Sequence, residues 1–119
     1  KLKMNFRYLG KKWERESRKF LEIEFNTPLI FKLINPEQMD WVVFLSEQKI
    51  AIVESKSTKK PHYYPFENKK RRNQLDRYFE IRANLIERGF DCSFYLLLKK
   101  GKEVILKKIN KKEDMERRY

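Results

Sequence analysis

The chain has 119 residues, and its 29 lysines and arginines against 17 aspartates and glutamates give a formal charge of +12. This length predicts one domain with a modest core, and no apolar run approaches the roughly 18 residues that a membrane-spanning helix needs. The charge excess indicates a polyanionic partner, most often nucleic acid, although a thermophile-type surface rich in lysine and glutamate is the alternative interpretation.

The first half of the chain predicts one helix and three strands. A helix over residues 11–24 is indicated by one face at helical spacing, formed by Trp13, Ser17, Phe20 and Leu21. It ends before Pro28, because a residue that precedes proline avoids the helical conformation. Three apolar runs then predict strands over residues 29–34, 41–45 and 50–55. A turn at 35–38 and a polar hairpin connection at 46–49 separate them.

The second half predicts a loop, a long helix and two more strands. The loop covers residues 57–68, and the helix covers residues 69–88 and stops at Gly89. One stripe of this helix predicts its packed face, namely Leu75, Tyr78, Phe79, Arg82, Leu85 and Ile86. The strand over 93–98 shows no alternation, which indicates a central strand covered on both faces, and the last strand covers 103–109.

This order of elements predicts an α/β fold with a central mixed five-stranded sheet flanked by helices. The helix that connects the third and fourth strands makes those two strands parallel, with a right-handed crossover. We expect a single domain over residues 1–109 and a charged tail, frayed or weakly helical, over 110–119. The lone Cys92 excludes an internal disulfide, is expected in the core, and favours a reducing compartment such as the cytoplasm.

Charged side chains appear where the third strand ends. Residues two apart share one face of a strand, so Glu54 and Lys56 extend the face that begins with Ile50 and Ile52. A half-buried charge needs a counter-charge, a metal ion or solvent at the rim of the sheet. Asp40 immediately precedes the second strand, and a hairpin would bring its carboxyl group towards that of Glu54.

Two adjacent carboxylates repel each other unless a cation lies between them, and Mg²⁺ accepts oxygen ligands of this kind. Such an ion would polarise a phosphodiester and help to generate hydroxide, and Lys56 would orient the water or stabilise the developing charge. The alternative is a surface pair of Glu54 with Lys56 and a turn residue at Asp40. Spacing alone does not decide between these two interpretations.

The residues Asp40 and Glu54-Ser55-Lys56 resemble the signature of PD-(D/E)xK nucleases. The stretch from Gly10 to Arg15 is similar to the Gly-x-x-x-Glu-Arg opening of archaeal Holliday junction resolvases, and the resemblance continues through residues 57–64 and Gln74. Met39 departs from the usual proline, and the Gly/Ser-rich loop of many resolvases is absent before Asp40. This second departure concerns junction specificity more than nuclease chemistry.

The resemblance implies a restriction-endonuclease-like fold, a requirement for Mg²⁺ with Mn²⁺ as a substitute, and a homodimer that acts on branched DNA. It points to Glu14 as the acid on the helix, whereas periodicity alone does not choose between Glu14 and Glu16. The implied metal ligands are the side chains of Asp40, Glu54 and Glu14 and the carbonyl of Ser55. Lys56 completes the catalytic set, and the expected location is the cytoplasm, in association with the nucleoid.

The residues expected to contact DNA phosphates follow the active-site strand or flank the helix acid. They are Arg15, Lys59, Lys60, His62, Tyr63, Lys69, Lys70, Arg71, Arg72 and Gln74. The four cations at 69–72 begin a helix, where positive charge opposes the helix dipole unless an anion binds. The alternative is that these four cations form a solvated first turn of the helix.

Two other functions stay open: a nuclease of the same superfamily that cuts duplex or single strands, and a catalytically silent DNA-binding module.

Overall fold

The structure is a computed structural model that describes residues 6–33, 40–66, 69–114 and 119, with only the backbone for 6–11, 69–71 and 112. Its elements are α1 (Phe6–Glu24), β1 (Ile30–Lys32), β2 (Trp41–Ser46), β3 (Lys49–Thr58), α2 (Lys69–Glu87), β4 (Asp91–Lys100), β5 (Glu103–Ile109) and a 3-10 turn at Lys112–Asp114. The predicted turn at 35–38 and Met39 lie outside the described residues. No helix in the described part is long and apolar enough to cross a membrane.

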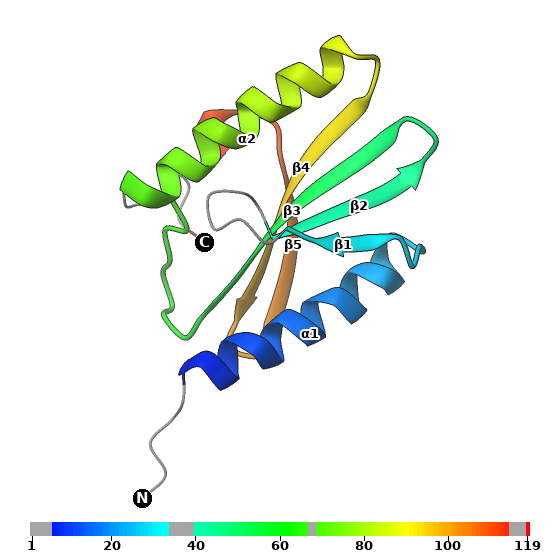
Figure 1. Cartoon of the computed structure of the whole chain (residues 1–119). Coiled ribbons are helices and arrows are strands. Elements are labelled where there is room, and N and C mark those ends of the chain that lie inside the picture. Colours follow the sequence, from blue (N-terminus) through cyan, green and yellow to red (C-terminus); the bar gives the residue numbers. More distant parts are fainter. Residues whose placement is uncertain (1–5, 34–39, 67–68, 115–118) are drawn as a thin grey trace, which may run out of the picture.

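The five strands form one mixed sheet in the order β1-β2-β3-β4-β5 (Figure 1). Strands β3 and β4 are parallel, and the other three pairs are antiparallel. Helix α2 makes the connection between the parallel pair, and Gly89 (φ 91°) ends it in the left-handed conformation that glycine adopts without strain. The predicted α/β class, the mixed five-stranded sheet and the parallel third and fourth strands are therefore confirmed.

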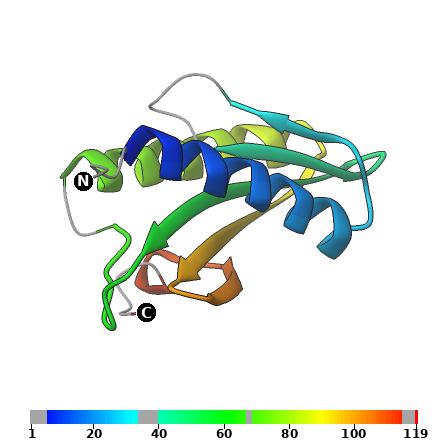
Figure 2. The same ribbon diagram turned by 90° about the horizontal axis from the view of Figure 1, so that it is seen from below.

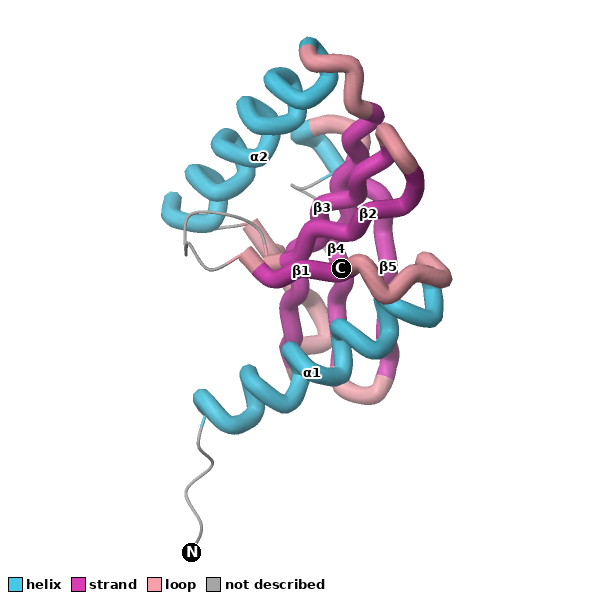
Figure 3. The backbone as a smooth tube through the Cα atoms, turned by 45° about the vertical axis from the view of Figure 1, so that its right-hand side comes forward, coloured by secondary structure: helices cyan, strands magenta, loops and turns pink. Residues whose placement is uncertain are grey.

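The two helices cover opposite faces of the sheet (Figures 2 and 3). Alternate residues of β3 explain this arrangement. Ala51 and Val53 pack with Trp13 and Leu21 of α1, whereas the other face packs against α2 through Ile50, Ile52, Leu75, Tyr78 and Phe94. Both faces of the sheet are buried, and the residues in the middle of β3 and β4 are accordingly almost all apolar. Such sequences are typical of central parallel strands.

Strand β3 is longer than its partner β2, and this difference creates the edge on which the site lies. The β2 ladder stops at Trp41, opposite Val53, while the pairing with β4 continues to Thr58. The prediction that residues 57 and 58 begin a loop was wrong, because the parallel ladder extends the strand through them. Strand β1 is shorter than predicted and β4 is longer.

The described part of the tail folds back onto the domain. Tyr63 and Tyr119 exchange two backbone hydrogen bonds of 2.7 and 2.8 Å. The Asp114 carboxylate accepts hydrogen bonds from the amides of Asn110 and Lys111 at 3.0 and 3.2 Å. Of the two expectations for the tail, frayed or weakly helical, the described residues show the helical one in the 3-10 turn at Lys112–Asp114. The domain boundary at residue 109 stays a prediction.

Candidate active site

A cleft of about 300 Å³ opens where β2 begins and β3 continues beyond it. Its walls come from α1, β1, the start of β2 and the overhanging end of β3. The lining residues are Trp13, Glu14, Lys32, Asp40, Trp41, Ser55 and Ser57. Asp40, Glu14 and Ser55, three of the four predicted metal-binding residues, therefore line one cavity.

Asp40 is fixed by the backbone of β3. Its Oδ2 accepts a hydrogen bond of 2.7 Å from the amide of Ser55. The N–H and C=O of one strand residue point to the same edge, so the carbonyl of Ser55 also faces the β2 side, where β2 begins only opposite Val53. The arrangement places a carboxylate beside a main-chain carbonyl at the end of the ladder, and both groups belong to the metal ligands that the resemblance implies.

Glu54 and Lys56 form an ion pair at the same end of the strand, on the face towards α2. Lys56 Nζ lies 3.4 Å from Glu54 Oε1, and only 10% and 7% of the two side chains are exposed. The ammonium group also lies 5.4 Å from the centre of the Phe66 ring, so the segment after β3 folds over it. The alternative of an exposed surface pair is excluded by this burial.

The electrostatics of Asp40 connect the groups around the cleft. Burial raises the pKa of its carboxyl group above the usual value, and the hydrogen bond from Ser55 opposes this effect. Lys56 and Lys32 also lower the pKa of Asp40, while the negative charge of Glu14 raises it. All three side chains are therefore close enough to Asp40 to act on its charge.

The structure distinguishes the two candidate acids of α1. Glu14 lines the cleft and forms an ion pair with Lys32 of β1. Glu16 instead pairs with Lys99 at 3.0 Å, a contact that lowers the pKa of Glu16. The resemblance pointed to Glu14, and Glu14 is the acid that the fold brings to the cleft.

The donors around the cleft suit a hard cation, because carboxylate and carbonyl oxygens are the ligands that Mg²⁺ prefers. Ser55 Oγ is buried, and no hydrogen-bond partner for it lies in the described part of the chain. This hydroxyl oxygen is therefore available to bind a cation or to form a hydrogen bond with a ligand. Within residues 6–33, 40–66, 69–114 and 119, however, no three His, Cys, Asp or Glu side chains are grouped to hold a metal ion. Glu14 faces Lys32 in this structure.

A second groove of about 460 Å³ adjoins the cleft along α1 and shares three lining residues with it: Glu14, Lys32 and Trp41. Arg15 and Arg18 complete its lining. Arg15 is exposed, and Arg18 is partly engaged with Glu22 at 3.3 Å. The predicted DNA contact at Arg15 therefore lies on a basic groove that leads to the carboxylates.

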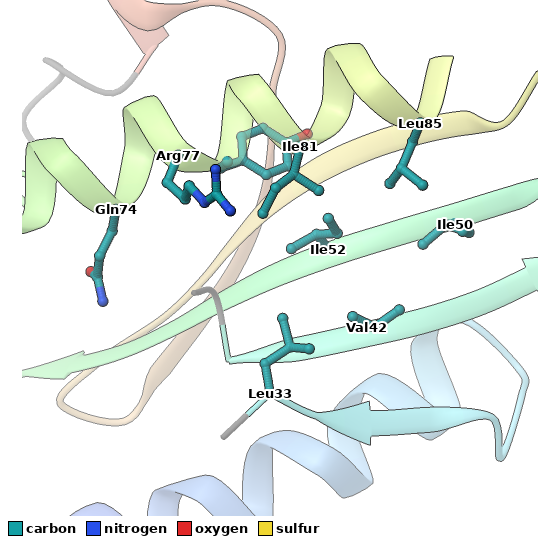
Figure 4. A pocket seen from close by; sticks show the side chains of 9 residues that line it. Leu33, Val42, Ile50, Ile52, Gln74, Arg77, Ile81 and Leu85 are labelled. Atoms are coloured by element: carbon teal, nitrogen blue, oxygen red, sulfur yellow. The ribbon is translucent and has the colours of Figure 1, made fainter. Parts of the chain in front are cut away.

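The other predicted DNA contacts are more dispersed. Lys59, Lys60, His62 and Arg72 are exposed, whereas Tyr63 is half-buried and pairs with the tail. Gln74 lines an apolar cavity of about 230 Å³ between α2 and the sheet, away from the cleft (Figure 4). The side chains of Lys69, Lys70 and Arg71 lie outside the described residues.

Sequence reasoning missed five residues that line these cavities: Lys32, Arg18, Trp13, Trp41 and Ser57. Lys32 had a visible signal, because it is the one charged residue in the apolar run from Leu29 to Ile34. A lone lysine inside such a strand requires solvent or a counter-charge at that position. Trp13 and Trp41 gave no such signal, since an indole ring is equally expected in the core.

Comparison with known proteins adds no assignment to these residues. No model of a known protein family matches the chain. No curated protein matches it significantly. The function is therefore argued from the cleft and its side chains.

Proposed function

We propose that the protein is a Mg²⁺-dependent endonuclease of restriction-endonuclease-like fold that hydrolyses phosphodiester bonds in branched DNA, with four-way junctions as the preferred substrate. The observation that carries the proposal is that Asp40, Glu54 and Lys56 are all held at the end of the β2–β3 ladder. Asp40 is hydrogen-bonded to Ser55 at 2.7 Å, and the adjacent Glu54 holds a buried lysine, Lys56, at 3.4 Å.

Asp40, Glu54, Glu14 and the carbonyl of Ser55 would hold the Mg²⁺ ion, for which Mn²⁺ would substitute. When bound, the ion polarises the phosphoryl group and lowers the pKa of a water molecule. The protein contributes a rigid acceptor set, because the Asp40 carboxylate is fixed by a main-chain amide. It also contributes partial exclusion of water, since Glu54 is buried and Asp40 is half-buried.

Lys56 supplies the positive charge of the reaction centre. Its ammonium group is held by Glu54 and by the face of the Phe66 ring. In this position it would hold the attacking water or stabilise the negative charge that develops on the phosphoryl oxygens. A lysine fixed before the substrate arrives needs little reorganisation during the reaction.

DNA would follow the basic groove along α1 to the cleft. Arg15 and Arg18 line this groove, and Lys59, Lys60 and His62 are exposed in the segment that follows β3. Contacts of this type bind phosphates and position the duplex without reading bases. Such contacts suit an enzyme that selects DNA by shape.

A four-way junction has approximate two-fold symmetry, and paired cleavage requires two active sites. We therefore include a homodimer in the proposal. Leu29, Phe31 and Phe44 are exposed at the β1 edge, and the rings of Phe31 and Phe44 lie 5.8 Å apart. A second copy would cover this apolar patch.

Phe44→Glu should then shift the sedimentation coefficient from that of a dimer to that of a monomer. A monomeric wild type would refute the proposed homodimer.

The test of the activity is a comparison of labelled four-way junction, flap, linear duplex and single strand, each incubated with Mg²⁺, Mn²⁺ or a chelator. We expect paired cuts in the junction that require metal, and loss of cutting by about 10²-fold or more in Asp40→Asn. Junction binding should persist in this variant, because a negative charge that repels phosphate has been removed.

The same experiment separates the other functions. Metal-dependent cutting of linear duplex or single strands at the junction rate would indicate another nuclease of the superfamily. Junction binding without cleavage in either metal would indicate a silent DNA-binding module. Cutting by Asp40→Asn at the wild-type rate would refute the proposed active site.

A further inference from the structure

Lys32 supplies a positive charge at the place where the proposed function requires a metal ion. It is the last residue of β1, and its side chain lies on the α1 side of the sheet because it shares a face with the buried Ile30. The ammonium group pairs with Glu14 Oε1. Both residues line the cleft that contains Asp40 and Ser55.

The charge of Lys32 reaches beyond Glu14. Lys32 lines the same cleft as Glu14 and Asp40, so the ammonium group partly neutralises the charge of two of the proposed metal-binding carboxylates. Glu14 retains the contact to Lys32, and the part of the chain that the structure describes contains no group of three acids arranged for a metal.

We infer that Lys32 is a positioning residue that competes with the metal ion for Glu14. In the metal-free protein it holds the Glu14 carboxylate and balances the charge of the cleft. With a dication held at Asp40, Glu14 would exchange the ammonium group of Lys32 for the metal ion and would complete the ligand set. This inference rests on the proposed function, because it concerns the same metal site.

The lysine side chain is suited to this exchange. Half of the Lys32 side chain is exposed, and a flexible four-carbon stem lets the ammonium group move without a change in the backbone. The adjoining groove, which Lys32 also lines, gives the displaced group access to solvent. Arginine at this position would hold the carboxylate through a planar fork and would be displaced less easily.

The test measures Mn²⁺ affinity by calorimetry in DNA-free protein. Lys32→Met should bind Mn²⁺ about tenfold more tightly than the wild type, because a positive charge close to the dication has been removed. Lys32→Arg should bind no more tightly than the wild type. Lys102→Met, which removes a lysine from the exposed turn between β4 and β5, controls for net charge and should leave the affinity unchanged within about twofold.

The dependence on Glu14 is measured with the double variant. The gain from Lys32→Met should become at least about threefold smaller in a Glu14→Gln background, since the lysine then has no carboxylate to hold. Equal or weaker binding by Lys32→Met in a folded protein would overturn the role of Lys32 and leave the nuclease proposal intact. Absence of Mn²⁺ binding in the wild type and every variant would overturn both.

Discussion

The two halves of β3 show how one strand changes its chemistry along its length. From Ile50 to Val53 the strand has neighbours on both edges, and every side chain is apolar and buried. From Glu54 to Thr58 it keeps β4 and extends beyond the ladder with β2. The side chains there are acidic, basic or hydroxylic. The loss of one ladder partner leaves backbone groups for a side chain such as Asp40 to bind.

Replacement of a charged side chain by a neutral one in the polar half of β3, from Glu54 to Thr58, should have the largest effect on activity. Glu54→Gln preserves the shape of the side chain but removes the negative charge that the proposed metal ion would require, so we expect cleavage of a four-way junction to fall by about 10²-fold or more. Single-turnover rates at saturating protein would measure the loss. Unfolding in urea would show whether the variant keeps its fold.

A substitution in the apolar half of β3, from Ile50 to Val53, should instead lower stability and leave the cleavage rate unchanged. Ile52→Ala removes a buried side chain and should lower the free energy of unfolding by about 3 kcal/mol, with a cleavage rate per folded molecule close to that of the wild type. If Ile52→Ala lost cleavage as completely as Glu54→Gln while it remained folded, the division of β3 into a structural and a chemical half would be wrong.

Lys56 should affect both properties, because it belongs to the chemical half and is nevertheless buried. Lys56→Met keeps the aliphatic stem but removes the cation from the buried Glu54, which should cost about 3 kcal/mol of unfolding free energy at neutral pH. The double variant Lys56→Met with Glu54→Gln should recover part of this loss. Chemical unfolding of the two single variants and the double variant would measure the coupling, and simple additivity would contradict a shared buried pair.

These halves also show what the sequence predicts and what it leaves open. Alternation placed Glu54 and Lys56 on one face. The position of Asp40 before β2 predicted that its carboxyl group approaches that of Glu54, and the structure shows it bonded to the amide of the next residue, Ser55. The end of β3 was misplaced because Ser57 and Thr58 are typical loop residues, whereas pairing with β4 holds them in a strand. Contacts between distant elements, such as Glu14 with Lys32, depend on how α1 lies across the sheet, which local periodicity does not specify.

The charge state of Asp40 gives a smaller effect that depends on pH. Because burial raises the pKa of this carboxyl group, the folded protein binds its proton more tightly than the unfolded chain does. Stability from this group is therefore present below the usual aspartate pKa and is lost as pH rises through the raised value. Without metal, Asp40→Asn should melt at a higher temperature than the wild type at pH 7, and the difference should vanish in acid. The amide oxygen still accepts the Ser55 hydrogen bond.

Addition of Mg²⁺ should reverse that order, since the ion stabilises only the protein that binds it. Melting curves of both proteins with chelator and with Mg²⁺, recorded across pH, would test the sign. A wild type that is more stable than Asp40→Asn at neutral pH without metal would contradict a raised pKa at this position.

The basic groove should produce the smallest change, because single exposed charges contribute modestly to binding. Each phosphate contact that is lost reduces the slope of log affinity against log salt by about one. Arg15→Gln removes a charge from the groove and should lower this slope for junction binding by about one, whereas Arg88→Gln, at the far end of α2, should leave it unchanged. Fluorescence anisotropy at several salt concentrations measures both slopes. Equal slopes for Arg15→Gln and the wild type would place the path of the DNA elsewhere and separate it from the groove that leads to Asp40.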